Sequence, residues 1–240
     1  MKFRHINTIM QKELQGYFNS PLAYIFMAVF LVFTSWAFFR GVFLAGQAAM
    51  RGYFALLPWV FLLLIPAITM RQFSEERKMG TMEVLLTAPV TPWEAVLGKF
   101  FASFSFLLMN LIFSLIIPAI LFIIGWPDWG TIAAGYLGAL FLGAAYLAIG
   151  LFISSLADSQ IISFILSAVF IFALFIIGDD AVLRAVPLSL VPIFKFLGLG
   201  VHFSSILRGV LDSRDVVYYA LLVFLFLHLT VANIHNRRWR

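Results

Sequence analysis

The sequence predicts an all-α membrane protein with six transmembrane helices. Hydrophobic residues make up 63% of the 240 residues and charged residues only 11%, whereas a soluble domain contains about 45–50% apolar and about 25% charged residues. The mean hydropathy is +1.02. The apolar residues also fall into long uninterrupted segments, which is typical of helices that cross a bilayer. Lipid is therefore the expected environment for most of the surface.

Six segments have the composition of a transmembrane helix, which needs about 20 mostly apolar residues. None of them contains an acidic residue. They are residues 21–39, 53–70, 100–124, 132–153, 161–177 and 216–232. Within the third segment Pro118 is expected to bend the helix, because proline removes a backbone donor. We expect these segments to form one membrane domain that covers residues 1–240.

The lysine and arginine residues predict that both termini are cytoplasmic. With six spans, the termini and the loop between the second and third spans share one side of the membrane, and the cytoplasmic side is enriched in Lys and Arg. Ten basic residues lie on that side: Lys2, Arg4, Lys12, Arg71, Arg77, Lys78, Lys99, Arg237, Arg238 and Arg240. The other six are Arg40, Arg51, Arg184, Lys195, Arg208 and Arg214.

Residues 1–20 have the pattern of an amphipathic helix. Apolar side chains recur at spacings of three and four, at Phe3, Ile6, Met10, Leu14 and Tyr17. Polar residues occupy the opposite face. This pattern predicts a helix that lies in the headgroup region, parallel to the membrane surface.

The most polar stretch is the loop between the second and third spans, residues 71–99. Gly80 is expected to end the helix that emerges from the membrane, and Thr81 to cap a short helix after it. Thr91 and Glu94 then form a capping box, with a proline at the first helical position. The sequence thus predicts a helix, a short crossbar and a second helix that project from the bilayer.

The loop between the fifth and sixth spans, residues 178–215, is apolar but interrupted. A continuous span is not expected there, and a pair of short interfacial or re-entrant helices fits better. The interruptions are Pro187, Pro192, Lys195, Gly198 and Gly200. A seventh span would also place the arginines of the C-terminus on the side where basic residues are depleted.

Small residues recur every four positions in the fourth span, at Gly135, Ala139 and Gly143. Such a stripe lets two helix backbones approach closely. The sequence leaves open whether the partner helix belongs to the same chain or to a second copy. His228 is ionisable within an apolar segment, and we interpret it as a hydrogen-bonding residue near the end of the sixth span.

Several functional classes lack their motifs. The chain has no cysteine, so it can form neither disulfides nor cysteine-ligated metal sites. There is no HExxH, no phosphate-binding Walker pattern and no GxSxG elbow. The net charge of +5 comes from basic residues that flank apolar spans, which suits anionic headgroups better than nucleic acid. No catalytic residue, metal or cofactor is therefore assigned to this chain.

Two segments carry a family resemblance. FSEERKMGTMEVLLTAPVTPWEAVLGKF, residues 73–100, resembles the segment between the second and third helices of ABC type-2 permeases. HFSSILRGVLDSRDVVYYALLVFLFLHLTV, residues 202–231, resembles the end of the same proteins, most closely the gliding-motility (GldF-like) group. The similarity extends over essentially the whole chain.

This resemblance implies a transmembrane domain like that of type V ABC exporters, in a bacterial inner membrane. It implies a dimer with a second copy or a related permease, seated on two copies of an ATPase that bind ATP and Mg²⁺. The crossbar would be the coupling helix that docks on the ATPase, residues 1–20 its connecting helix and residues 178–215 the external helices. The matching coupling positions are Glu75, Glu76, Arg77, Gly80, Thr81, Glu83, Leu85 and Leu86.

An energy source outside the chain is also expected from the residues themselves, since the sequence has no nucleotide-binding motif and no carboxylate within a span. Asn110 and Ser114 are polar groups in the third span, where they either hold helices together or line a translocation path. Two other functions stay open. One is a membrane enzyme that acts on lipids, with Asp179, Asp180 and His202 as its candidates, and the other is a scaffold that binds proteins through the crossbar.

Overall fold

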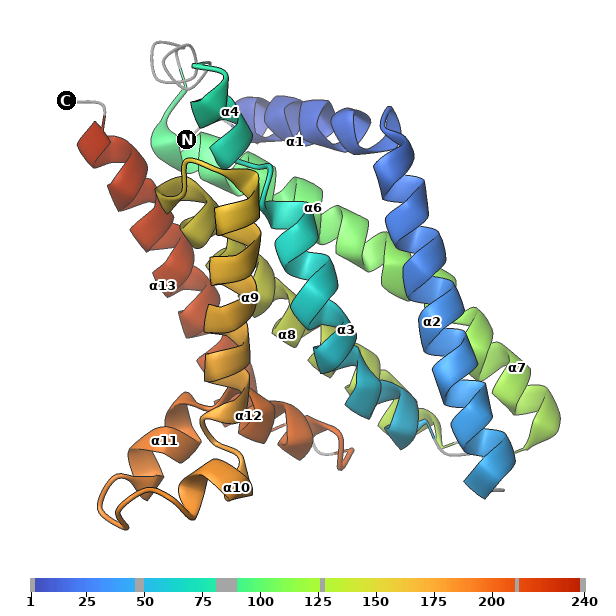
Figure 1. Cartoon of the computed structure of the whole chain (residues 1–240). Coiled ribbons are helices and arrows are strands. Elements are labelled where there is room, and N and C mark those ends of the chain that lie inside the picture. The colour runs from blue at the N-terminus through green and yellow to red at the C-terminus, as the bar shows by residue number, and fades with distance from the viewer. Residues whose placement is uncertain (1–2, 46–49, 81–89, 126–127, 210–211, 238–240) are drawn as a thin grey trace.

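The computed structural model describes residues 3–45, 50–80, 90–125, 128–209 and 212–237, and in these ranges the chain is helical with no strand (Figure 1). The predicted all-α class is therefore confirmed. The helices are α1 (Phe3–Phe18), α2 (Pro21–Ala45), α3 (Arg51–Thr69), α4 (Ser74–Lys78), α6 (Pro92–Ser114), α7 (Ile116–Ile124), α8 (Trp129–Leu156), α9 (Gln160–Ile176), α10 (Asp180–Leu183), α11 (Val191–Leu197), α12 (Leu199–Ile206) and α13 (Ser213–Arg237).

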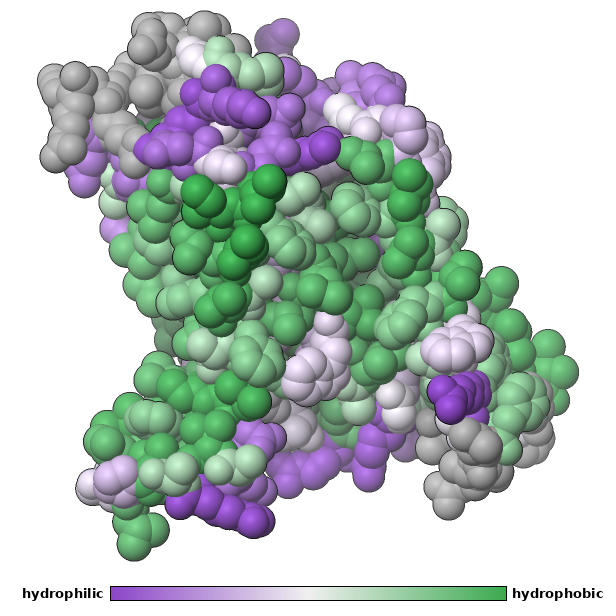
Figure 2. Space-filling model, in the orientation of Figure 1, coloured by the Kyte–Doolittle hydropathy of each residue, from purple (hydrophilic) through white to green (hydrophobic). Residues whose placement is uncertain are grey.

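Five stretches in the described part of the chain are long and apolar enough to cross a membrane: α2, α3 with its extension, α6 with α7, α8 and α13. The predicted fifth span corresponds to α9, an apolar helix of 17 residues. At 1.5 Å per residue its length is about 26 Å, slightly less than the roughly 30 Å of a bilayer core. Figure 2 shows a broad apolar band between two more polar ends, as expected for a membrane protein. The six-span layout itself stays a prediction.

Helix α8 lies at the centre of the bundle and packs against α3, α6, α9 and α13. Its small residues face large ones: a Cβ at Gly135 would overlap the ring of Phe54, and a Cβ at Gly143 would overlap Leu107. Ala139 on the same stripe is fully buried. Of the two alternatives that the sequence left open, the structure thus shows packing within the chain.

The third predicted span bends where α6 gives way to α7. Pro118 has no backbone N–H for the carbonyl of Ser114, four residues earlier. The hydroxyl of Tyr136 on α8 donates to that carbonyl at 3.1 Å. The proline therefore breaks the helix as expected, and a neighbouring helix satisfies the freed group.

Helix α1 crosses one end of the bundle, which we call the α1 end, and it meets α2 at a sharp angle (Figure 1). Its amphipathic character is confirmed, but the apolar face is divided. Ile6 is buried, and Ile9 lies against Gly98 of α6, where a Cβ would come within 2.7 Å of it. Phe3 is 86% exposed. Part of the apolar face that was predicted to contact lipid headgroups is therefore packed against another helix of the same chain.

The opposite end of the bundle, the α11 end, carries the short helices α10, α11 and α12 (Figure 1). Within residues 178–209 the chain forms these three short helices, where the sequence predicted a pair. Gly178 and Gly198 approach closely there, since a Cβ on Gly198 would lie 2.7 Å from the Cα of Gly178. The glycines that interrupt the loop thus allow its helices to pack on the end of α9.

Candidate functional site

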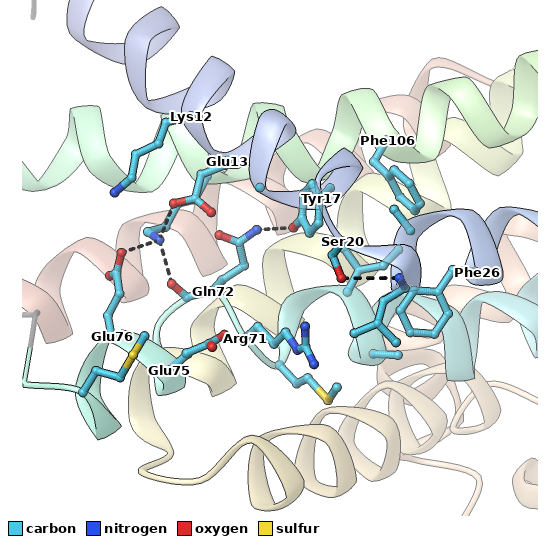
Figure 3. Close-up of a pocket in the computed structure, with 18 residues that line it drawn as sticks. Lys12, Glu13, Tyr17, Ser20, Phe26, Arg71, Gln72, Glu75, Glu76 and Phe106 are labelled. Carbon is cyan, nitrogen blue, oxygen red and sulfur yellow. Dashed lines mark hydrogen bonds and ion pairs between the residues drawn. The ribbon is translucent and has the colours of Figure 1, made fainter.

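A buried lysine joins three helices at the α1 end. Lys99 of α6 has a side chain only 2% exposed. Its Nζ donates to Glu13 Oε1 of α1 at 2.9 Å and to Glu76 Oε1 of α4 at 2.8 Å. A third bond, of 2.7 Å, reaches the backbone carbonyl of Gln72 (Figure 3). We call these four residues the Lys99 junction.

The geometry of the Lys99 junction compensates for burying the charge. An ammonium group has three N–H donors, and here each has an acceptor. The ring of Phe73 adds a cation–π contact, with Nζ 5.1 Å from the ring centroid. A buried ion is costly when it loses its partner, by about 3–5 kcal/mol. The Lys99 junction therefore holds α1, α4 and α6 in one arrangement.

A neutral hydrogen-bond network lies next to the Lys99 junction. The Tyr17 hydroxyl of α1 lies 3.0 Å from Ser103 Oγ of α6, and Gln72 Nε2 donates to both oxygens. Burial raises the pKa of the Tyr17 hydroxyl well above its usual value. Tyr17 consequently stays protonated at physiological pH. The network gives α1 a second attachment to α6 and to the segment that precedes α4.

Helix α4 is also attached to the end of α8. Arg77 Nη1 donates to the backbone carbonyl of Leu156 at 2.6 Å and pairs with Asp158 at 2.8 Å. Because Asp158 is 85% exposed, the carbonyl bond is the more important of the two. Ser154 Oγ accepts from the backbone N–H of Phe73 at 3.1 Å. Helix α4 and the residue before it are thus bound to α8 as well as to α6.

The start of α6 confirms the predicted capping box. Thr91 Oγ1 accepts from the backbone N–H of Glu94 at 3.3 Å, and Glu94 Oε2 accepts from the N–H of Thr91 at 3.0 Å. The same Oε2 lies 3.2 Å from His5 Nδ1 of α1. The cap therefore also connects α6 to the N-terminal helix.

The structure describes only part of the predicted coupling set. Glu75, Glu76 and Arg77 lie on α4, and Gly80 ends the helix region with a φ of +68°, a conformation that favours glycine. The remaining members, Thr81, Glu83, Leu85 and Leu86, lie outside the described residues.

Sequence reasoning assigned no site role to most of the Lys99 junction. It named Glu76, but it counted Lys99 only as a topological charge and did not single out Glu13 or Gln72. One signal was present, because Lys99 directly adjoins the apolar residues of the third span and a buried charge needs a partner. The identity of that partner could not be read, since Glu13 lies 86 residues away.

Asn110 and Ser114 are both fully buried on α6, away from the Lys99 junction. Asn110 Nδ2 donates to the carbonyl of Phe106 at 2.8 Å, and Ser114 Oγ lies 3.1 Å from the Tyr136 hydroxyl. Their role in a translocation path stays a prediction. His228 is exposed and its ring lies 5.8 Å from that of Trp93, between centroids.

The polar residues at the α11 end form hydrogen bonds with one another and with the backbone. His202 Nδ1 lies 2.7 Å from Asp215 Oδ1, and its Nε2 lies 3.1 Å from the carbonyl of Phe196. Asp179 accepts from the N–H of Ala181 and caps α10. In the ranges that the structure describes, no group of three or more His, Cys, Asp or Glu side chains could hold a metal ion.

Two comparisons bear on the identity of the chain. No curated protein matches it. A family model described as "ABC-2 family transporter protein" matches residues 43–190. That range is more than half of the chain and includes α4 and most of the Lys99 junction. The matched family is the broader one implied by residues 73–100, and the gliding-motility subgroup stays a prediction. The chain belongs to the ABC-2 family of transporter proteins.

Proposed function

We propose that this chain is the membrane-spanning permease subunit of an ATP-binding cassette exporter. A separate ATPase binds ATP and Mg²⁺, and the permease converts its motion into substrate movement across a bacterial inner membrane. The complex contains two permease subunits and two copies of the ATPase. Family membership supports the permease role, and the lack of a nucleotide-binding motif in the sequence supports a separate motor.

The observation that carries this proposal is the Lys99 junction. Glu76 lies on α4, which leads directly into residues 81–89, the proposed coupling segment. Lys99 lies on α6, directly before the predicted third span. A push on α4 would therefore reach α6 and α1 through the partly buried ion pairs of Lys99, of 2.8 and 2.9 Å. Rigid elements joined in this way can pass a domain motion on to the membrane helices.

The charge distribution supports a cytoplasmic location for the α1 end. Arg4, Lys12, Arg71 and Lys78 are all exposed there. Cytoplasmic segments next to membrane helices are enriched in such residues. This orientation would present α4 to the compartment that contains ATP.

Affinity purification in mild detergent tests the proposal. The chain, isolated from its native membrane, should bring with it a soluble protein that carries a phosphate-binding loop and hydrolyses ATP. Leu85→Arg should lower the ATPase recovered by about tenfold or more, which corresponds to about 1.4 kcal/mol of binding free energy. Leu85 is chosen from its sequence position, on the apolar ridge of the proposed coupling helix. Glu83→Arg reverses a charge on the same helix and should act in the same direction.

Leu188→Arg is the matched control, because Leu188 is 90% exposed at the α11 end. It should leave ATPase recovery unchanged. Wild-type recovery and hydrolysis with Leu85→Arg would refute the coupling assignment. The chain has no cysteine, so a single cysteine at Glu75 gives a unique label. Modification of that cysteine from the side opposite ATP would refute the orientation.

A further inference from the structure

A pocket of about 820 Å³ lies beside the Lys99 junction (Figure 3). Its walls come from α1, from the beginning of α2, from the end of α3 and from α4 and α6. Because α2 begins and α3 ends at the α1 end, the pocket lies where the apolar band gives way to the polar end of the molecule. Figure 2 shows this boundary on the surface. It corresponds to the headgroup level of one leaflet.

The wall of the pocket is divided into an apolar and a polar half. Leu22 and Phe26 of α2 and Ile68 of α3 line the apolar half. Arg71 and Glu75 belong to the polar half, toward α4. A ligand that suits both halves has a charged end and a hydrocarbon end. A phospholipid presents these two ends at this depth in a bilayer.

The charges of the pocket favour a zwitterionic headgroup. Three basic side chains, Lys12, Arg71 and Lys99, face three acidic ones, Glu13, Glu75 and Glu76. Lys99 is already paired with two of the carboxylates. Arg71 is exposed and has no ion pair among the described residues, and a guanidinium group is well suited to bind phosphate. The carboxylates would repel a headgroup with several negative charges.

Gly16 is the position from which the pocket can be filled without disturbing the packing of the helices. It lies near the end of α1 and lines the pocket. A Cβ at this position would meet nothing within 4 Å, and its φ is not in the left-handed region. Glycine in a helix costs about 1 kcal/mol relative to alanine. A side chain as small as alanine would therefore fit at position 16 without a clash, whereas a large side chain there would fill the pocket.

We propose that this pocket binds a zwitterionic phospholipid, with its phosphate on Arg71, its amine on Glu75 and an acyl chain along α2 and α3. The bound lipid would fill the space between α1 and residues 70–73, the turn that leads from α3 into α4. It would thus be a fixed part of the α1 end. Nothing in this proposal depends on the ATPase.

Native mass spectrometry of the full chain in detergent tests the site. The probes are phosphatidylethanolamine, phosphatidylglycerol and free phosphoethanolamine, which has the headgroup without acyl chains. We expect one retained phosphatidylethanolamine per chain, and about tenfold weaker binding of the other two probes, which is about 1.4 kcal/mol each. Equal binding of phosphatidylglycerol would overturn the zwitterionic assignment. Equal binding of phosphoethanolamine would show that the acyl chains do not contribute to binding. The pocket would then be a site for a soluble anion, and the assignment of a lipid would be overturned.

Two pairs of variants locate the site. Gly16→Trp, which fills the pocket, should reduce retention of phosphatidylethanolamine about tenfold, and Gly16→Ala should leave it unchanged. Arg71→Gln should also reduce it, by about tenfold. Its control is Arg51→Gln, because Arg51 is an exposed arginine at the opposite end of α3. Normal retention in both Gly16→Trp and Arg71→Gln would refute the proposal, and the ATPase measurements would be unaffected by that result.

Discussion

The two ends of the bundle are held together by different kinds of contact. At the α1 end, Lys99 joins side chains that are 86 and 23 residues away in the sequence. At the α11 end, apart from the His202–Asp215 pair, the bonds between elements reach backbone carbonyls. Tyr218 donates to Leu197 at 2.7 Å, and Tyr219 donates to Leu199 at 2.9 Å, over 21 and 20 residues.

This difference indicates which end can move as one piece. A buried charge that is shared by three helices cannot be given up by one of them without a large cost. A hydroxyl bonded to a carbonyl contributes only about 0.5–1.5 kcal/mol. The α1 end is therefore suited to pass on a displacement, whereas the short helices of the α11 end can shift relative to one another at lower cost.

The largest expected effect is at Lys99. Lys99→Met keeps the length of the side chain but leaves Glu13 and Glu76 without their cation. We expect a loss of about 3 kcal/mol in the free energy of unfolding, or a fall of roughly 6–12 °C in Tm measured in detergent. Lys195→Met is the control, because Lys195 is exposed on α11, and it should change Tm by less than about 2 °C.

A double variant distinguishes the lost attraction between Lys99 and its carboxylates from the cost of keeping those carboxylates without Lys99. Glu76→Gln in the Lys99→Met background removes one of the two stranded carboxylates, so it should restore part of the lost Tm. If Lys99→Met alone melts like the wild type, the Lys99 junction does not hold the α1 end together and the comparison between the two ends fails.

The next largest loss of stability is expected when two glycines of α8 are replaced by alanine. A Cβ at Gly150 would collide with Thr69, whose hydroxyl donates to Ile65 at 3.0 Å and so is fixed. A Cβ at Gly138 would come within 2.9 Å of Ile206 Cγ2, a smaller overlap than that of a Cβ at Gly150 with Thr69 Oγ1. Gly150→Ala should therefore cost about 1–3 kcal/mol, and Gly138→Ala should cost less, because its overlap is smaller. Tm of both variants in the same detergent checks this, and an equal loss would contradict it.

The sequence was most informative where local rules decide the structure. The capping box at Thr91 and Glu94 and the break near Pro118 each depend on residues within four positions of one another. Gly80 was predicted to end the helix that emerges from the membrane, but it follows the short helix α4, and α3 already ends at Thr69. Hydrophobic length was almost as informative, since each predicted span corresponds to an apolar helix. Helix α9 shows the limit of hydrophobic length as a guide, because composition alone does not settle whether 17 residues cross a bilayer.

The candidate site was less predictable because its contacts are long-range. Glu13 lies seven residues after Ile6 and so shares the buried side of α1, but the sequence does not show which cation it meets there. Only the packing of α1 across α6 brings it to Lys99. In the same way, the apolar face of α1 gave no sign that Ile9 would pack on Gly98. Patterns along the chain show which face of a helix is polar, but they do not show which other helix meets that face.

The smallest expected effect is at the α11 end, where Tyr219→Phe removes one hydroxyl. The carbonyl of Leu199 that accepts from it lies in the first turn of α12, where it can also accept an N–H from the helix itself. Because that carbonyl keeps a partner, the loss should be about 1 kcal/mol or less. A fall in Tm as large as that of Lys99→Met would mean that the α11 end is no looser than the α1 end. A small fall, with ATPase recovery unchanged, would support a rigid α1 end that is coupled to the motor and an α11 end that is free to adjust.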